Sequence, residues 1–207
     1  MRKLLHIKSS PRGDRSRSAQ IAEAFLGSYR CKHPGAEIDE IDLFELALPE
    51  FDGDRVAAKM SFFGDPAMNA SQQSAWDEIV AITRCFGSAD EYVFSVPMWN
   101  GSIPYRLKHY IDVVTQAGLL FDFNPVSGYS GLLCGKRATA IYTSGIYAPG
   151  VSAVFGIDHH STYFDEWLRF IGISDVTTIR YQPNLLTPDP AIGLAAAREA
   201  AAQAGAR

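Results

Sequence analysis

Cysteine is scarce in this chain of 207 residues, and its three cysteines, at 31, 85 and 134, lie far apart. No Cys-x-x-Cys pair occurs, and an odd number of isolated cysteines argues against a disulfide framework. The N-terminal stretch MRKLLHIKSS also has too short an apolar run for a signal peptide. Together these features favour a reducing cytoplasm as the compartment.

Long apolar runs and a strong charge excess are missing as well. No apolar run approaches the roughly 20 residues that cross a bilayer, so we expect no membrane partner. The net charge is −4, and the 19 lysines and arginines form no long block. Nucleic acid is therefore not expected as a partner either. Hydrophobic residues make up 47% of the chain, which is typical of a globular protein with a sizeable core.

Short apolar strands alternate with amphipathic helices along the chain. The pattern predicts strands at 3–8, 37–43, 91–97, 136–143 and 176–181. It predicts helices at 18–31, 71–86, 104–116, 161–171 and from 187 to the C-terminus, with at most a short helix at 55–63. We therefore predict one α/β domain over residues 1–207, a three-layer, doubly wound, five-stranded parallel sheet with strand order 2-1-3-4-5.

Ligands of such sheets lie beyond the carboxyl ends of the strands, which singles out the loops after the first, third and fourth strands. The first loop, SSPRGDRSRS at 9–18, is rich in serine and arginine and leads into a helix. A helix N-terminus offers free N–H groups and a positive dipole end, so this loop suits a phosphate. The alternative is an ordinary capped loop with Ser16 or Ser18 as the N-cap residue.

The second and third loops suit the flat ring of a ligand. After Pro97 ends the third strand, Trp99 can supply an apolar face, Asn100 an in-plane contact, and Gly101 close approach of the main chain. The third loop, YTSGIYAPG at 142–150, can touch a ring edge. The alternatives are a tryptophan that anchors its loop to the core and a simple turn.

Other familiar motifs are absent or incomplete. GxGxxG occurs nowhere, and the Gly-Lys pair at 135–136 is followed by arginine and a strand, which is the wrong context for a P-loop. GYSG at 128–131 misses the G-x-S-x-G elbow by one residue. The Asp-His-His run at 158–160 has no further ligand at helical spacing, so we predict no metal site. His109 is expected to be structural.

The block PMWNGSIPYRLKHYID at 97–112, with SSPRGDRSRS upstream and FIGI downstream, resembles the FMN-dependent NADH-azoreductases of the flavodoxin-like quinone-reductase group. The likeness runs over essentially the whole chain. The resemblance implies a flavodoxin-like fold, one noncovalent FMN per chain and NADH as the electron donor. It also implies a quinone or azo compound as the acceptor, turnover by a ping-pong scheme, and a homodimer.

The resemblance also implies site residues by position. Those expected to hold the FMN phosphate are Ser10, Ser16, Arg17 and Ser18. Those expected to line the ring are Met98, Trp99, Asn100, Gly101, Ser144, Gly145, Ile146 and Tyr147. Phe121 and Trp167 are expected to form a substrate pocket at the flavin of a partner subunit. No catalytic acid or base is expected, because the flavin itself carries the chemistry.

Two positions depart from the pattern of that group. Many relatives have phenylalanine where Gly101 stands, so we expect a more open pocket wall and wide acceptor tolerance. The third loop often reads Ser-Arg-Gly-Gly in that group and reads Ser-Gly-Ile-Tyr here. The missing arginine bears on the flavin potential and on acceptor preference.

Two other classes of function stay open on the sequence. A flavodoxin-type electron carrier has no substrate of its own, but such carriers tend to be shorter and strongly acidic. A hydrolase on a similar sheet needs a nucleophile–base pair, and the sequence shows none.

Overall fold

A parallel sheet of five strands forms the centre of the molecule in the computed structural model. The structure describes residues 2–207; of these, Asp14 is described by its backbone alone. The strands are β1 (Lys3–Lys8), β2 (Glu37–Asp42), β3 (Glu91–Pro97), β6 (Arg137–Thr143) and β7 (Asp175–Tyr181). Their order is β2-β1-β3-β6-β7. When only the strands of this sheet are numbered along the chain, the order is 2-1-3-4-5, because β4 and β5 belong to a separate hairpin. This confirms the predicted fold class and strand order.

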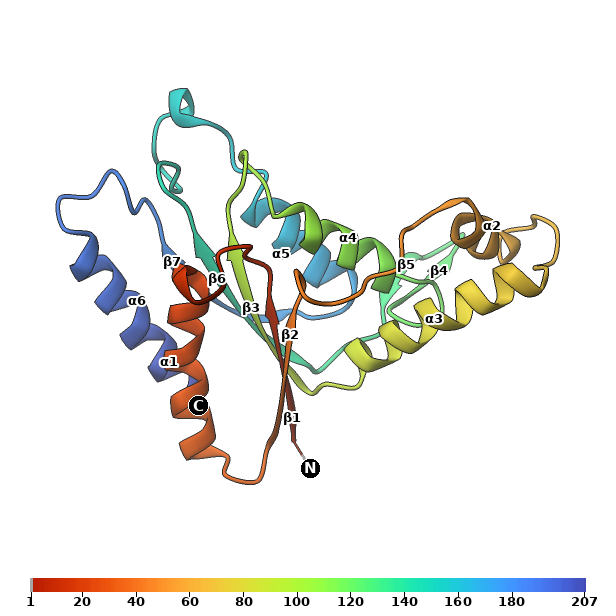
Figure 1. Cartoon of the computed structure of the whole chain (residues 1–207), viewed down its shortest axis with the longest axis horizontal. Coiled ribbons are helices and arrows are strands. Elements are labelled where there is room, and N and C mark those ends of the chain that lie inside the picture. Colours follow the sequence, from red (N-terminus) through yellow and green to blue (C-terminus); the bar gives the residue numbers. More distant parts are fainter. Residues whose placement is uncertain (1) are drawn as a thin grey trace.

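Helices cover both faces of the sheet, with α1 and α6 on one side and α4 and α5 on the other (Figure 1). The helices are α1 (Arg17–Lys32), α2 (Gly53–Ser61), α3 (Ala70–Gly87), α4 (Tyr105–Val114), α5 (Ser161–Phe170) and α6 (Pro190–Gly205). One apolar cluster lies between the sheet and α1 and α6, and a larger one lies on the opposite face with α4 and α5. Every predicted helix is present, with bounds shifted by a few residues.

The start of α3 differs from the prediction. The sequence pattern places it at Ser71, but Asn69 is the N-cap residue and accepts a hydrogen bond from the backbone N–H of Gln72 at 2.9 Å. The Gln72 side chain accepts in return from the Asn69 N–H at 3.0 Å, which completes a capping box. The predicted start was wrong because the prediction was based on the apolar stripe of the helix, and Asn69 lies before that stripe begins.

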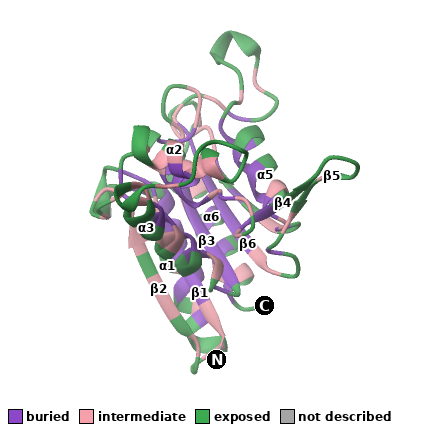
Figure 2. Ribbon diagram, turned by 90° about the vertical axis from the view of Figure 1, so that its right-hand side faces the viewer, coloured by how far each residue is buried: buried purple, intermediate pink, exposed green. Residues whose placement is uncertain are grey.

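A small antiparallel hairpin between α4 and β6 was not predicted. It pairs β4 (Phe121–Asn124) with β5 (Gly128–Gly131) and projects from the body as a largely exposed arm, whereas the central strands are buried (Figure 2). Its strands are four residues long and lack a clear alternation of buried and exposed residues. The two-residue period that identifies a strand in a sequence was therefore missing.

Candidate functional site

The three predicted loops meet at the carboxyl edge of the sheet and enclose two adjoining cavities. The first has a volume of about 470 Å³ and is lined by residues from all three loops. The second, of about 780 Å³, is lined by the loops after β3 and β6. Both are bordered by Met98, Ser144 and Gly145, so they form one continuous site. Of the twelve predicted cofactor-binding residues, only Ser18 lines neither cavity.

The N-terminus of α1 faces the first cavity. Ser16 is the N-cap residue, and its Oγ accepts a hydrogen bond from the Ala19 N–H at 3.4 Å. Its Oγ also lies 3.1 Å from the Ser18 Oγ, so Ser18 reaches the cavity only through Ser16. The first turn contains no acidic residue, and its first N–H groups have no carbonyl partner within the helix. The capped loop that the sequence offered as an alternative is therefore present, and it does not exclude a phosphate at the free N–H groups of the same helix start.

Loop two ends in a tight turn. The Trp99 N–H donates to the Ser102 carbonyl at 2.9 Å, and the Ser102 N–H donates to the Trp99 carbonyl at 3.0 Å. Asn100 and Gly101 occupy the turn with φ of 50° and 80°, and Asn100 is the only non-glycine residue with positive φ in the described part of the chain. Asn-Gly is the pair that such a turn favours, so local backbone chemistry accounts for both residues.

A segment from the β6–α5 connection holds loop two from behind. The His159 N–H donates to the Gly101 carbonyl at 3.1 Å, and the His160 Nε2 donates to the Val96 carbonyl at 2.9 Å. Phe155 and Ile157 of this segment line the second cavity, and the Ile157 carbonyl lies 3.7 Å from where a Gly101 Cβ would be. The space expected beside Gly101 is thus bordered by this segment.

Loops two and three are also joined directly. The Met98 N–H donates to the Thr143 carbonyl at 2.8 Å, which continues the pairing of β3 with β6 beyond Pro97. Within loop three, the Ser144 hydroxyl donates to the Tyr147 carbonyl and closes the loop on itself. Both loops therefore have fixed backbones where a ring would lie.

Beneath loop one, a buried polar network anchors β1 to its neighbours. The His6 Nε2 lies 2.9 Å from the Ser95 Oγ, and the His6 Nδ1 lies 3.3 Å from Glu40 Oε2. The Ser9 hydroxyl donates to the Ser95 carbonyl at 2.6 Å. Ser95, His6 and Glu40 have the order of a hydrolase triad, but Ser95 lies within β3 and is only 1% exposed. Since a nucleophile must reach its substrate, this network is structural.

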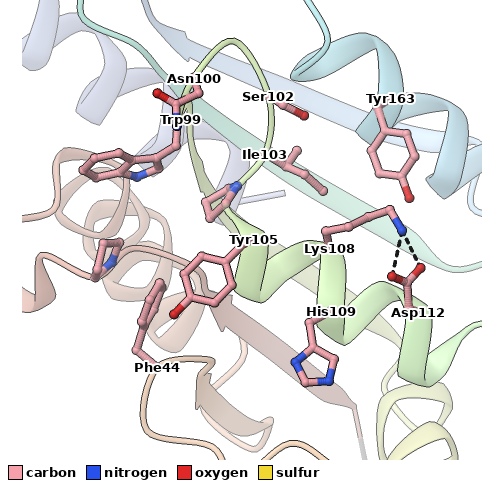
Figure 3. Close-up of a pocket in the computed structure, with 12 residues that line it drawn as sticks. Phe44, Trp99, Asn100, Ser102, Ile103, Tyr105, Lys108, His109, Asp112 and Tyr163 are labelled. Atoms are coloured by element: carbon pink, nitrogen blue, oxygen red, sulfur yellow. Dashed lines mark hydrogen bonds and ion pairs between the residues drawn. The ribbon is translucent and has the colours of Figure 1, made fainter. Parts of the chain in front are cut away.

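An apolar groove lies beside the site. It has a volume of about 930 Å³, and Trp99, Tyr105, Phe44 and Tyr163 line it (Figure 3). His109 also lines it, and its Nε2 donates to the Pro49 carbonyl at 2.7 Å. Trp99 is 46% exposed and Tyr105 72% exposed, so the groove presents aromatic side chains to solvent.

Phe121 and Trp167 lie elsewhere in the same chain. They line a further cavity of about 510 Å³ together with Lys59 and Tyr163, and neither borders the two cavities at the sheet edge. The Trp167 Nε1 donates to the Thr115 Oγ1 at 3.0 Å. Burial lowers the pKa of the Lys59 ammonium group. Any contact of Phe121 or Trp167 with a flavin therefore requires a second subunit.

No group of three or more His, Cys, Asp or Glu side chains among the described residues is placed to hold a metal ion. In the same part of the chain, no helix combines the length and apolar character needed to cross a membrane.

The sheet order and the loop site define a flavodoxin-like protein, and comparison with known proteins agrees. The family described as "Flavodoxin-like fold" matches residues 2–204. The FMN-dependent NADH:quinone oxidoreductase of Ruegeria pomeroyi is 53% identical over 193 residues, which cover 93% of this chain and 95% of that protein. The chain therefore belongs to the flavodoxin-like family, and FMN-dependent NADH:quinone oxidoreductases are its relatives there.

Solved structures give the same result. The azoreductase of Bacillus anthracis strain Sterne superposes with a TM-score of 0.87 at 28% identity and covers 100% of this chain and 99% of its own. An FMN-dependent NADH-azoreductase of Bacillus anthracis strain Ames Ancestor, solved in complex with FMN, gives a TM-score of 0.86 at 28% identity, with 100% and 99% coverage.

Two segments of the site were missed from the sequence. One is the 153–160 stretch, of which the sequence analysis considered only 158–160, and only as a source of metal ligands. The other is Asn184 and Leu185, which follow β7 and line the first cavity. Because β7 is parallel to the other strands, its following loop ends at the same edge of the sheet. That rule would have added the fourth loop to the three we chose.

We predict that His160 makes stability depend on pH. The pKa of an unfolded histidine is about 6.5, and burial lowers the pKa of His160 to about 4 against its hydrogen bond to Val96. The folded state thus binds this proton less readily. The stabilisation is complete above about pH 6.5 and is lost as the pH falls toward about 4.

The measurement is urea unfolding of the wild type and of His160→Gln, whose amide keeps a donor for Val96 but cannot titrate. Between about pH 6.5 and 4.5 the wild type should lose up to about 1.4 kcal/mol per pH unit more than the variant. Parallel pH profiles for the two proteins would contradict the assignment.

Proposed function

We propose that the chain is an FMN-dependent oxidoreductase that takes a hydride from NAD(P)H and reduces quinones or azo compounds by two electrons. The observation that carries this proposal is the joined pair of cavities, with a helix N-terminus at one end and two fixed loops at the other. The Ruegeria relative bears the corresponding name at 53% identity.

The residues present fit FMN in chemistry and in layout. Ser10 and Ser16 are nearly buried hydroxyls at the N-terminus of α1, and Arg17 beside them is exposed, which suits a phosphate dianion. Trp99 and Ile146 are each 46% exposed at the ring end. A flat ring bound in the joined cavities would cover both side chains.

The bound FMN would supply the redox chemistry, and the protein would orient the FMN. Ser10, Ser16, Arg17 and the α1 N-terminus hold the phosphate. Loops two and three, joined through Met98 and Thr143, fix the ring between them. Ser18 supports the phosphate site through Ser16. No residue of the chain needs to act as acid or base.

A flavodoxin-type carrier is the alternative function. The groove of about 930 Å³ beside Trp99 favours the enzyme, because a carrier without its own substrate has no need of a large apolar site next to the ring. We also propose a cytoplasmic location, since all three cysteines are free and exposed.

The phosphate site gives the first test of this function. Arg17→Glu should weaken the binding of FMN at least tenfold and the binding of riboflavin less than threefold, because only FMN has a phosphate. Ser16→Ala should act in the same direction and also reduce stability by about 1 kcal/mol through loss of the cap. The control is Arg198→Glu, an exposed position on α6. Equal losses for FMN and riboflavin would argue against the phosphate contact.

The kinetic scheme gives the second test. A planar donor and a planar acceptor need the same open face of the ring, so one must leave before the other binds. Initial rates with NADH and a benzoquinone should give parallel double-reciprocal lines. Under anaerobic conditions, NADH alone should bleach the flavin absorbance. Intersecting lines, or a flavin that NADH cannot bleach, would favour the carrier.

We also propose a homodimer in which Phe121 and Trp167 reach the partner's site. Its basis is the exposed pair of aromatic side chains after α2, where Phe62 and Phe63 are 59% and 55% exposed. Light scattering at micromolar concentration should give a dimer, and the double change Phe62→Asp, Phe63→Asp should shift it toward monomer. Ile192→Asp, at another exposed apolar position, should not. A wild-type monomer would refute the shared site.

A further inference from the structure

The loop after β7 is attached to loop three by its backbone. The Asn184 N–H donates to the Ser144 carbonyl at 3.0 Å, and the Leu185 N–H donates to the Gly145 carbonyl at 2.7 Å. These bonds lie just beyond the paired strands β6 and β7, whose register ends at Thr143 and Tyr181. The loop therefore lies at the carboxyl edge of the sheet in a fixed position.

Leu185 lies directly over Gly145. A Cβ atom built on Gly145 would be 2.9 Å from the Leu185 Cδ1, closer than real Cβ atoms come, and 3.3 Å from its Cγ, which is a tight contact. It would also lie 4.0 Å from the Asn184 Oδ1. The φ of Gly145 is not in the left-handed region. Backbone conformation does not demand glycine at this position, but a Cβ atom there would push the Leu185 side chain out of its place.

Leu185 borders both cavities, whereas Asn184 borders only the first, and neighbouring Leu186 borders neither. Leu185 is nonetheless 72% exposed. An apolar side chain held at the junction of two ligand cavities, and open to solvent, is placed to be covered by a ligand that spans both.

We propose that Asn184 and Leu185 form a fourth FMN-binding segment, an inference that rests on the proposed function. Leu185 packs on the flavin where the ring meets the ribityl chain. The Asn184 side-chain amide forms a hydrogen bond with a ribityl hydroxyl. Asn184 borders the first cavity, which also contains the α1 N-terminus, and its backbone N–H is bound to the Ser144 carbonyl of loop three, so we assign it to the ribityl chain that joins the ring to the phosphate.

The proposal predicts a pattern of affinities unlike that of the phosphate loop. The ring and the ribityl chain are common to FMN and riboflavin, so Leu185→Ala should weaken both about tenfold, by loss of apolar contact. Asn184→Ala should weaken both about three- to tenfold, by loss of one hydrogen bond. Leu186→Ala is the matched control and should change neither affinity.

Gly145 allows a second, internal test. Gly145→Ala alone should lower the affinity for both flavins, because the added Cβ displaces Leu185. In a Leu185→Ala background the same change should cost nothing further, since the clash is gone. Additive losses would show that Gly145 acts on the flavin without Leu185 and would overturn that part of the proposal.

The experiment is titration of the full-length, FMN-stripped protein with FMN and with riboflavin, followed by flavin fluorescence, with thermal unfolding of each variant as a folding check. If the wild type binds both flavins and the Leu185 and Asn184 variants bind them with unchanged affinity, this inference is overturned and the proposed function stays intact. A wild type that binds neither flavin would overturn the proposed function itself. Losses confined to FMN would reassign the segment to the phosphate and contradict the ribityl contact.

Discussion

The parallel alignment of β1, β3, β6 and β7 is the constraint on which the site depends. It brings the loops that follow these strands to one edge, although they lie far apart in the sequence. A backbone hydrogen bond between Met98 and Thr143 extends the strand pairing into the loops, and another between Asn184 and Ser144 joins two loops just beyond the strands. The sheet therefore fixes the loop backbones, and the loops need few side-chain contacts of their own.

Buried polar side chains complete this support. His160 holds the end of β3 from the α5 side, and the His6, Ser95 and Ser9 contacts hold the start of loop one from the α1 side. Neither histidine is placed to react with a ligand, because both are fully buried. This arrangement agrees with a function in which the cofactor supplies the chemistry and the chain supplies position, charge and a dry surface.

The fold follows from local sequence signals, and most of the site follows from the family resemblance. The apolar strands and the helical periodicity predicted the sheet and its order, and the resemblance named eleven of the residues that line the two cavities. The misses have physical causes. The hairpin at Phe121–Gly131 has no burial period, and Asn184 joins the site through backbone pairing, which leaves no mark on side-chain pattern. His159 and His160 bind carbonyl groups whose proximity depends on the tertiary fold.

The flavin content of the purified full-length protein tests the central claim most directly. After saturation with FMN and removal of the excess by gel filtration, the account predicts flavin absorbance in the protein fraction at about one FMN per chain, and FMN as the flavin released on denaturation. A protein fraction that carries no flavin after this treatment would contradict the assignment of the cavities at the carboxyl edge of the sheet.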